Sequence, residues 1–93
     1  MRGAIIGFGV IASTGHTPAF AKMAEHEIVA VADTVQARRQ AARDAIPGVR
    51  TYATYQELLS TETGLDFVDI ATPPSFHLEI AQAAAALGLH VLC

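Results

Sequence analysis

The sequence predicts an α/β fold, a doubly wound parallel sheet of about five strands. Apolar, β-branched runs alternate with segments of helical period along all 93 residues. The runs lack the polar alternation of a solvent-facing strand, which is typical of strands buried on both faces. With 52% hydrophobic and 16% charged residues the chain cannot be disordered, and six Lys and Arg are too few for a nucleic-acid surface. We expect one domain over residues 1–93.

Four strong strands and one weak strand are predicted. Each strong run is ended by glycine, by a polar residue or by proline, except the last, which reaches the final residue. Since the strands are parallel, their carboxyl ends share one edge of the sheet, where such folds bind ligands. The strong strands are expected at 4–7, 28–32, 67–71 and 90–93, and the weak one at 49–52.

Helices are predicted between the strands. Residues 35–46 are alanine-rich and are stopped by Pro47-Gly48, and residues 55–60 form a short helix. We expect a single turn near 10–12, a break, and a helix from Pro18 to about 25. The helix before Gly88 has its apolar positions on one stripe, Phe76, Ile80, Ala83, Ala84 and Leu87.

A glycine-rich motif follows the first strand. Residues Gly7-Phe8-Gly9-Val10-Ile11-Ala12 fit G-x-G-x-x-A. The first glycine allows a sharp turn, the second lets a pyrophosphate approach the backbone, and the third small residue permits close helix packing. Free N–H groups at the next turn would face the phosphates. The motif therefore predicts dinucleotide binding in a Rossmann-like fold, although two glycines could also serve only as a tight turn.

Asp33 ends the second strand, 21 residues after Ala12, where an acid would hold the ribose hydroxyls of the cofactor. Its alternative role is to cap the next helix. Arg38 and Arg39 lie one helical turn further on and are expected to point to solvent. A 2′-phosphate would then meet a carboxylate and no cation, so NAD is favoured over NADP.

The third strong strand closes with Thr72-Pro73-Pro74, whose prolines hold an extended loop at the ligand edge. We expect these residues, and His77 in the first turn of the next helix, to contact the cofactor. The four histidines and one cysteine form no metal-ligand set, and no serine lies in a G-x-S-x-G turn. We name no catalytic residue and no metal site.

Together these segments resemble the N-terminal Rossmann part of the Gfo/Idh/MocA-type oxidoreductases, the glucose–fructose oxidoreductase and inositol dehydrogenase group. The matching segments are residues 3–9 with 16–19, 29–33, 69–74 with His77, and 88–93. The resemblance implies that residues 7–12 bind the pyrophosphate, that Asp33 binds the adenine ribose, and that residues 72–74 line the cofactor site. Two departures are Ala12 in place of a third glycine and Pro74 where asparagine is common.

In that family the segment resembling 91–93 continues into Glu-Lys-Pro, whose lysine is implicated in catalysis, and a substrate domain follows. We therefore expect this chain to be truncated at its last strand and inactive by itself. We also expect the unpaired strand edge and uncovered apolar surface to make an isolated chain self-associate as a homo-oligomer or be marginally stable.

The predicted function is the nucleotide-binding part of an NAD-dependent dehydrogenase that transfers hydride to or from a sugar, polyol or related alcohol. Two alternatives remain: a non-catalytic nucleotide-binding module, and an S-adenosylmethionine-dependent methyltransferase domain. The second usually has an acid in the first strand and G-x-G-x-G, whereas position 11 is Ile. With no signal peptide or spanning segment visible, we expect a cytoplasmic protein without membrane or nucleic-acid partners.

Overall fold

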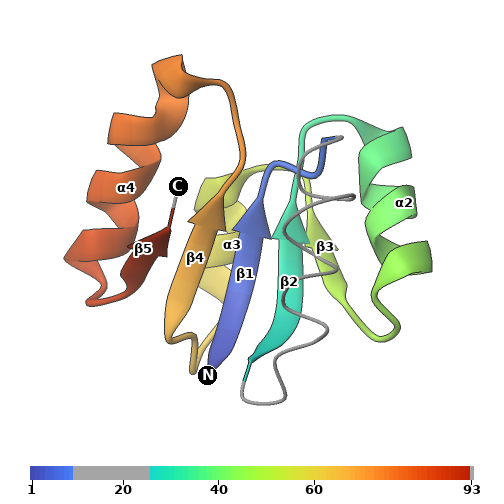
Figure 1. Cartoon of the computed structure of the whole chain (residues 1–93), viewed down its shortest axis with the longest axis horizontal. Coiled ribbons are helices and arrows are strands. Elements are labelled where there is room, and N and C mark those ends of the chain that lie inside the picture. Colours follow the sequence, from blue (N-terminus) through green and yellow to red (C-terminus); the bar gives the residue numbers. More distant parts are fainter. Residues whose placement is uncertain (10–25, 93) are drawn as a thin grey trace.

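The computed structural model describes residues 1–9 and 26–92, which build one five-stranded parallel sheet in the order β3-β2-β1-β4-β5 (Figure 1). The predicted fold class is confirmed. The strands are β1 (Arg2–Ile6), β2 (Glu27–Ala32), β3 (Arg50–Tyr52), β4 (Phe67–Ile70) and β5 (His90–Leu92).

The strand order reverses at β1, which has β2 on one side and β4 on the other. Two backbone hydrogen bonds continue the pairing beyond the strand ends. Gly7 N–H donates to Ala32 O at 2.7 Å, and Ala71 N–H donates to Ile6 O at 2.8 Å. The loops after these three strands are therefore held together at the point of reversal, where open α/β sheets bind ligands.

Helices cover both faces of the sheet. They are α2 (Gln36–Ala45), α3 (Tyr55–Thr61) and α4 (His77–Ala86), with a 3₁₀ turn, η2 (Pro74–Phe76), leading into α4. Figure 1 shows α2 beside the β2–β3 end of the sheet and α4 beside the β4–β5 end, with α3 behind the strands. None of the described helices has the length and apolar character needed to cross a membrane.

Alternate residues of the strands belong to two hydrophobic clusters, one on each face of the sheet. Leu58 of α3 and Ile80 of α4 pack with Ala4 and Ile6 on one face. On the other face Ala42 of α2 packs with Ile5, among others. Because residues 3–6 of β1 and all of β4 are buried, the continuous apolar runs in the sequence have a direct structural cause.

Most element predictions are confirmed, with a few differences. The third strong strand ends at Ile70, one residue earlier than expected. Gly88 follows α4 with φ +77°, as a helix stop requires. The stripe on α4 is only partly buried, because Phe76 and Leu87 at its two ends are 53% and 58% exposed. The turn near 10–12, the helix from Pro18 and residue 93 lie outside the described residues.

Candidate functional site

The first glycine of the motif lies where the loop after β1 touches the loop after β4. Gly7 has φ +91°, and a Cβ on it would lie 2.9 Å from Thr72 Cγ2 and 3.0 Å from the carbonyl carbon of Ala71. Residues with a side chain rarely adopt this backbone conformation, and no side chain would fit at this position. The predicted sharp turn is therefore also a close contact between two loops.

The other two described residues of this loop, Phe8 and Gly9, have different surroundings. The Phe8 side chain is 2% exposed and packs in the cluster on the α2 face, so only its backbone is near the site. A Cβ on Gly9 would have no described atom within 4 Å. Among the described residues nothing therefore fills the space beside Gly9, as a close ligand approach requires. The predicted contacts of Val10, Ile11 and Ala12 lie outside the described residues.

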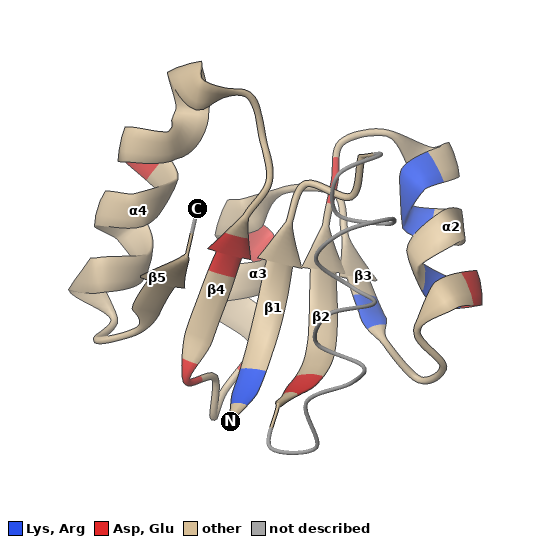
Figure 2. Cartoon of the chain, in the orientation of Figure 1, with Lys and Arg blue, Asp and Glu red and all other residues tan. Residues whose placement is uncertain are grey.

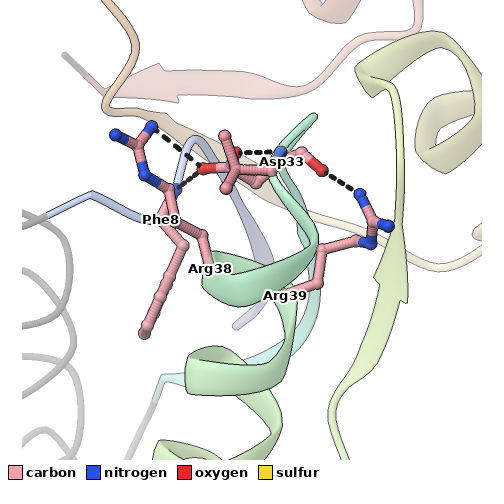
Figure 3. Close-up of polar contacts among 5 residues, drawn as sticks. Phe8, Asp33, Arg38 and Arg39 are labelled. Carbon is pink, nitrogen blue, oxygen red and sulfur yellow. Dashed lines mark hydrogen bonds and ion pairs between the residues drawn. The ribbon is translucent and has the colours of Figure 1, made fainter.

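Asp33 is buried, with 7% of its surface exposed, and its carboxylate organises the site. Oδ2 accepts a hydrogen bond from the Phe8 N–H at 2.7 Å, and Oδ1 accepts one from the Val35 N–H at 2.8 Å (Figure 3). Since Val35 is the residue before α2, Asp33 also supports the helix start, the alternative role considered from sequence. Two carboxylate oxygens offer about four acceptor positions, so acceptor capacity for a ligand remains.

The expectation that Arg38 and Arg39 point to solvent is wrong for Arg39, which is hydrogen-bonded, whereas Arg38 is exposed and makes only a long contact. Figure 3 shows both side chains turned toward Asp33 from opposite sides. Arg39 Nη1 donates to the Asp33 carbonyl oxygen at 2.8 Å, and Arg38 Nη1 lies 3.9 Å from Asp33 Oδ2. The first turn of a helix that starts beside Asp33 carries these side chains back over the strand end, because Cβ atoms tilt toward the helix N-terminus.

Thr72 carries a buried hydroxyl whose Oγ1 has no hydrogen-bond partner within the described part of the chain. Buried hydroxyls are normally paired, so this atom is available to a ligand. The backbone carbonyl oxygen of Thr72 accepts a hydrogen bond from His77 Nε2 at 2.5 Å. His77 thus fixes the loop after β4, and Pro74 begins η2 beside it.

A cavity of about 310 Å³ lies beyond the carboxyl ends of the strands. Among the predicted site residues Gly7, Gly9, Asp33, Thr72 and Pro73 line it. Pro74 and His77 are not among its lining residues, and His77 reaches the site only through Thr72. The structure thus brings together the loops after β1, β2 and β4, as the parallel arrangement predicted.

Sequence reasoning missed one wall of this cavity. It is formed by the residues that follow β3, Ala53, Thr54, Tyr55 and Gln56. These residues follow the carboxyl end of the weak strand, so the rule used for the other strands would have found them. The Tyr55 hydroxyl donates to Glu79 Oε1 at 2.5 Å, linking α3 to α4. This hydrogen bond, with burial, raises the pKa of Tyr55, which holds the phenol in its neutral form.

Within residues 1–9 and 26–92 no group of three or more His, Cys, Asp or Glu side chains is arranged to hold a metal ion. The site consists instead of a glycine turn, a buried carboxylate with a guanidinium beside it, and a hydroxyl without a partner among the described residues, all around one crevice. A crevice of this composition, at the reversal point of a parallel sheet, defines a Rossmann-type α/β domain.

The comparisons with known proteins agree. The sequence model of the Gfo/Idh/MocA oxidoreductase family, described as an oxidoreductase family with an NAD-binding Rossmann fold, matches residues 1–93. D-apiose dehydrogenase of Paraburkholderia graminis is 38% identical over 92 residues, 99% of this chain and 24% of that protein. D-xylose 1-dehydrogenase (NADP⁺) 2 of Haloferax volcanii is 41% identical over 69 residues, 74% of this chain and 21% of that protein.

A similar solved structure is an oxidoreductase from Agrobacterium radiobacter in complex with NAD⁺, L-tartaric acid and magnesium. It has a TM-score of 0.92 and 30% identity, over 100% of this chain and 27% of that one. The chain thus spans about a quarter of the length of these relatives. It belongs to the Gfo/Idh/MocA oxidoreductase family, as the resemblance in the sequence implied.

Proposed function

We propose that this chain is the nucleotide-binding part of an NAD(P)-dependent oxidoreductase that acts by hydride transfer on a sugar, polyol or related alcohol. The observation that carries the proposal is the cavity where the glycine turn and the Asp33 carboxylate meet the Thr72 hydroxyl, which has no partner among the described residues. Support for the substrate class comes from relatives that are dehydrogenases of D-apiose and D-xylose.

The described residues fit a dinucleotide. No described atom lies within 4 Å of a Cβ at Gly9, which suits a pyrophosphate close to the backbone. Asp33 lines the cavity and retains acceptor positions for the two ribose hydroxyls. Thr72 Oγ1 gains in a ligand the hydrogen-bond partner that it lacks among the described residues.

When bound, a nicotinamide cofactor supplies the hydride acceptor or donor. This chain's own residues bind and position. Gly7 allows the loops after β1 and β4 to touch. Asp33 joins the loop after β1 to the start of α2. His77 holds the backbone carbonyl of Thr72 and thereby the loop after β4.

We propose no proton-transfer group within this chain and expect it to be inactive as a dehydrogenase by itself. The share of its relatives that it covers, about a quarter, supports this division of labour. For the cofactor, the buried Asp33 carboxylate favours the free ribose hydroxyls of NAD, because charge-assisted hydrogen bonds to them contribute about 1.5–3 kcal/mol.

A binding titration in the complete protein tests the proposal. Wild type should bind NADH, seen as a change in nicotinamide fluorescence, and should not bind S-adenosylmethionine. Gly9→Val should abolish NADH binding while the thermal unfolding midpoint stays close to wild type, because no described atom lies within 4 Å of a Cβ at this position. Binding of S-adenosylmethionine, or undiminished NADH binding by Gly9→Val, would contradict the proposed cradle.

The non-catalytic module is tested by activity instead of binding. The complete protein is expected to reduce NAD⁺ with at least one member of a panel of aldoses and polyols. NADH binding without turnover of any member of such a panel would favour the module.

A further inference from the structure

The hydroxyl of Tyr55 joins α3 to α4 beside the cavity. It donates to Glu79 Oε1 at 2.5 Å, and within the described part of the chain no other hydrogen bond connects these two helices. Glu79 is the only Lys, Arg, Asp or Glu residue of α4, the single red band on that helix in Figure 2. Its carboxylate makes no ion pair with a described residue, so no described cation competes with the Tyr55 hydroxyl for it.

The side chain of Tyr55 is a wall of the cavity that is held along its ring and at its tip. Tyr55 lines the cavity, and its ring packs against the hydrophobic cluster that contains Leu58 and Ile80. The hydroxyl at the tip has its partner in Glu79, so the ring cannot turn away without losing that hydrogen bond. Because α3 has seven residues, too few for a stable helix by itself, its position depends on contacts of this kind.

The first turn of α4 connects this wall to the loop after β4. Ile80 follows Glu79 directly, is 2% exposed and lines the cavity. His77, two residues before Glu79, donates a hydrogen bond to the backbone carbonyl oxygen of Thr72. One helical turn therefore contacts α3 through Glu79 and the Thr72 loop through His77. The two sides of the cavity are thus linked through α4.

We propose that Tyr55 is a positioning residue: its hydrogen bond to Glu79 holds the walls of the cavity at the separation that the cofactor requires. The proposal rests on the proposed dinucleotide function and goes further by naming a residue that preorganises the site. With the hydrogen bond in place, the walls are ordered before the cofactor binds. Without it, binding has to order α3 against α4, and the cost of that ordering lowers the affinity.

The test is a fluorescence titration of the complete protein with NADH. Tyr55→Phe keeps the ring and removes the hydroxyl. It should weaken NADH binding by about three- to tenfold, the range that one partly exposed hydrogen bond allows. Glu79→Ala should cause a similar loss, and Glu79→Gln, which keeps an acceptor oxygen, should restore part of the affinity. In the Glu79→Ala background, Tyr55→Phe should change the dissociation constant by less than about twofold, because the two residues act through one contact.

Tyr52→Phe is the matched control, because it removes the same atom from a tyrosine three residues earlier. The Tyr52 hydroxyl donates to Glu62, and Tyr52 does not line the cavity. This variant should lower the thermal unfolding midpoint, yet bind NADH within about twofold of wild type. Because the Glu79 side chain is exposed, Glu79→Ala keeps the test available if Tyr55→Phe does not fold.

Three results would overturn the proposal. One is an affinity for NADH in folded Tyr55→Phe, or in Glu79→Ala, within about twofold of wild type. Another is a loss of affinity in Tyr52→Phe as large as in Tyr55→Phe, because affinity would then follow stability alone. The third is an effect of Tyr55→Phe that persists undiminished in the Glu79→Ala background. Failure of wild type itself to bind NADH would contradict the dinucleotide function, and it is recognised before any variant is compared.

Discussion

The carboxylate of Asp33 and the backbone N–H of Phe8 are joined by a hydrogen bond of 2.7 Å between N and Oδ2. The bond connects the end of β2 to the glycine turn after β1. The carboxylate that is placed to hold a ribose is therefore also part of the frame of the phosphate loop. Removal of this carboxylate should therefore affect both ligand binding and loop geometry.

Asp33→Ala is expected to weaken NADH binding by about ten- to a hundredfold through the lost ribose contacts. The change should also disturb the glycine loop, because Asp33 Oδ2 accepts the hydrogen bond of the Phe8 N–H. Removing the acceptor leaves the Phe8 and Val35 N–H groups unpaired, at a cost of about 1–3 kcal/mol in the free energy of unfolding for a buried donor.

Asp33→Asn separates the two roles, since its amide oxygen keeps one acceptor while its charge is lost. It should lose less stability than Asp33→Ala in chemical denaturation, yet favour NADPH over NADH relative to wild type. Equal changes in the dissociation constants of NADH and NADPH would show that Asp33 acts only as a structural acceptor.

The sequence predicted the first three strong strands well because each is a continuous apolar run with a clear end. Glycine and proline, the residues that marked those ends, have backbone preferences that do not depend on the rest of the fold. Gly7, Asp33 and Thr72 were found because they follow parallel strands, and the cavity gathers them at one edge.

What the sequence could not predict depends on side-chain direction between elements. Arg38 and Arg39 lie on an amphipathic helix whose exposed face ordinarily carries arginines into solvent. Only the packing of α2 beside the end of β2 puts Asp33 within their reach. The wall after β3 was missed because that strand is only three residues long and gives a weak pattern.

Gly7→Ala should destabilise the protein by about 1–3 kcal/mol through its positive φ, and by more through the contact with Thr72. Gly48→Ala is the matched control, because Gly48 has φ +81° but no described atom within 4 Å of an added Cβ. Urea unfolding should therefore show a larger loss for Gly7→Ala. Equal losses would mean that the loops after β1 and β4 do not constrain each other.

Gly3→Ala places a methyl group 2.2 Å from Cζ of the Phe67 ring, where β1 and β4 pair. The buried ring has to move, and overpacking of this kind costs about 1–3 kcal/mol. Thermal unfolding should show the loss, and the double variant with Phe67→Leu should lose less than the sum of the two single changes. Strict additivity would argue that the ring has room elsewhere.

The carboxylate of Glu62 should make stability depend on pH. It follows α3, its side chain is 3% exposed, and Arg50 binds both its oxygens at 2.6 and 2.7 Å. The Tyr52 hydroxyl donates to it as well. The hydrogen bonds and charge of Arg50, together with the Tyr52 hydroxyl, hold the pKa of Glu62 below its ordinary value of 4.5. The same carboxylate raises the pKa of Tyr52 above 10.0.

The direction of the pH dependence of stability follows from the lowered pKa of Glu62. A carboxyl group with a lowered pKa in the folded state contributes stability above its unfolded pKa, and this contribution is lost as the pH falls through the folded value. Glu62→Gln should therefore be less stable than wild type near neutral pH by about 1–3 kcal/mol, the cost of a charged hydrogen bond. The difference should shrink as the solution is acidified below the ordinary pKa of a glutamate.

Glu57→Gln in α3 is the control, because the Glu57 carboxyl group has no hydrogen bond or ion pair within the described residues. Its stability relative to wild type should show no such convergence. Urea unfolding of wild type and the two variants across this pH range measures the effect. A difference in the free energy of unfolding between Glu62→Gln and wild type that stays constant down to the lowest pH would show that the ion pair with Arg50 contributes no net stability.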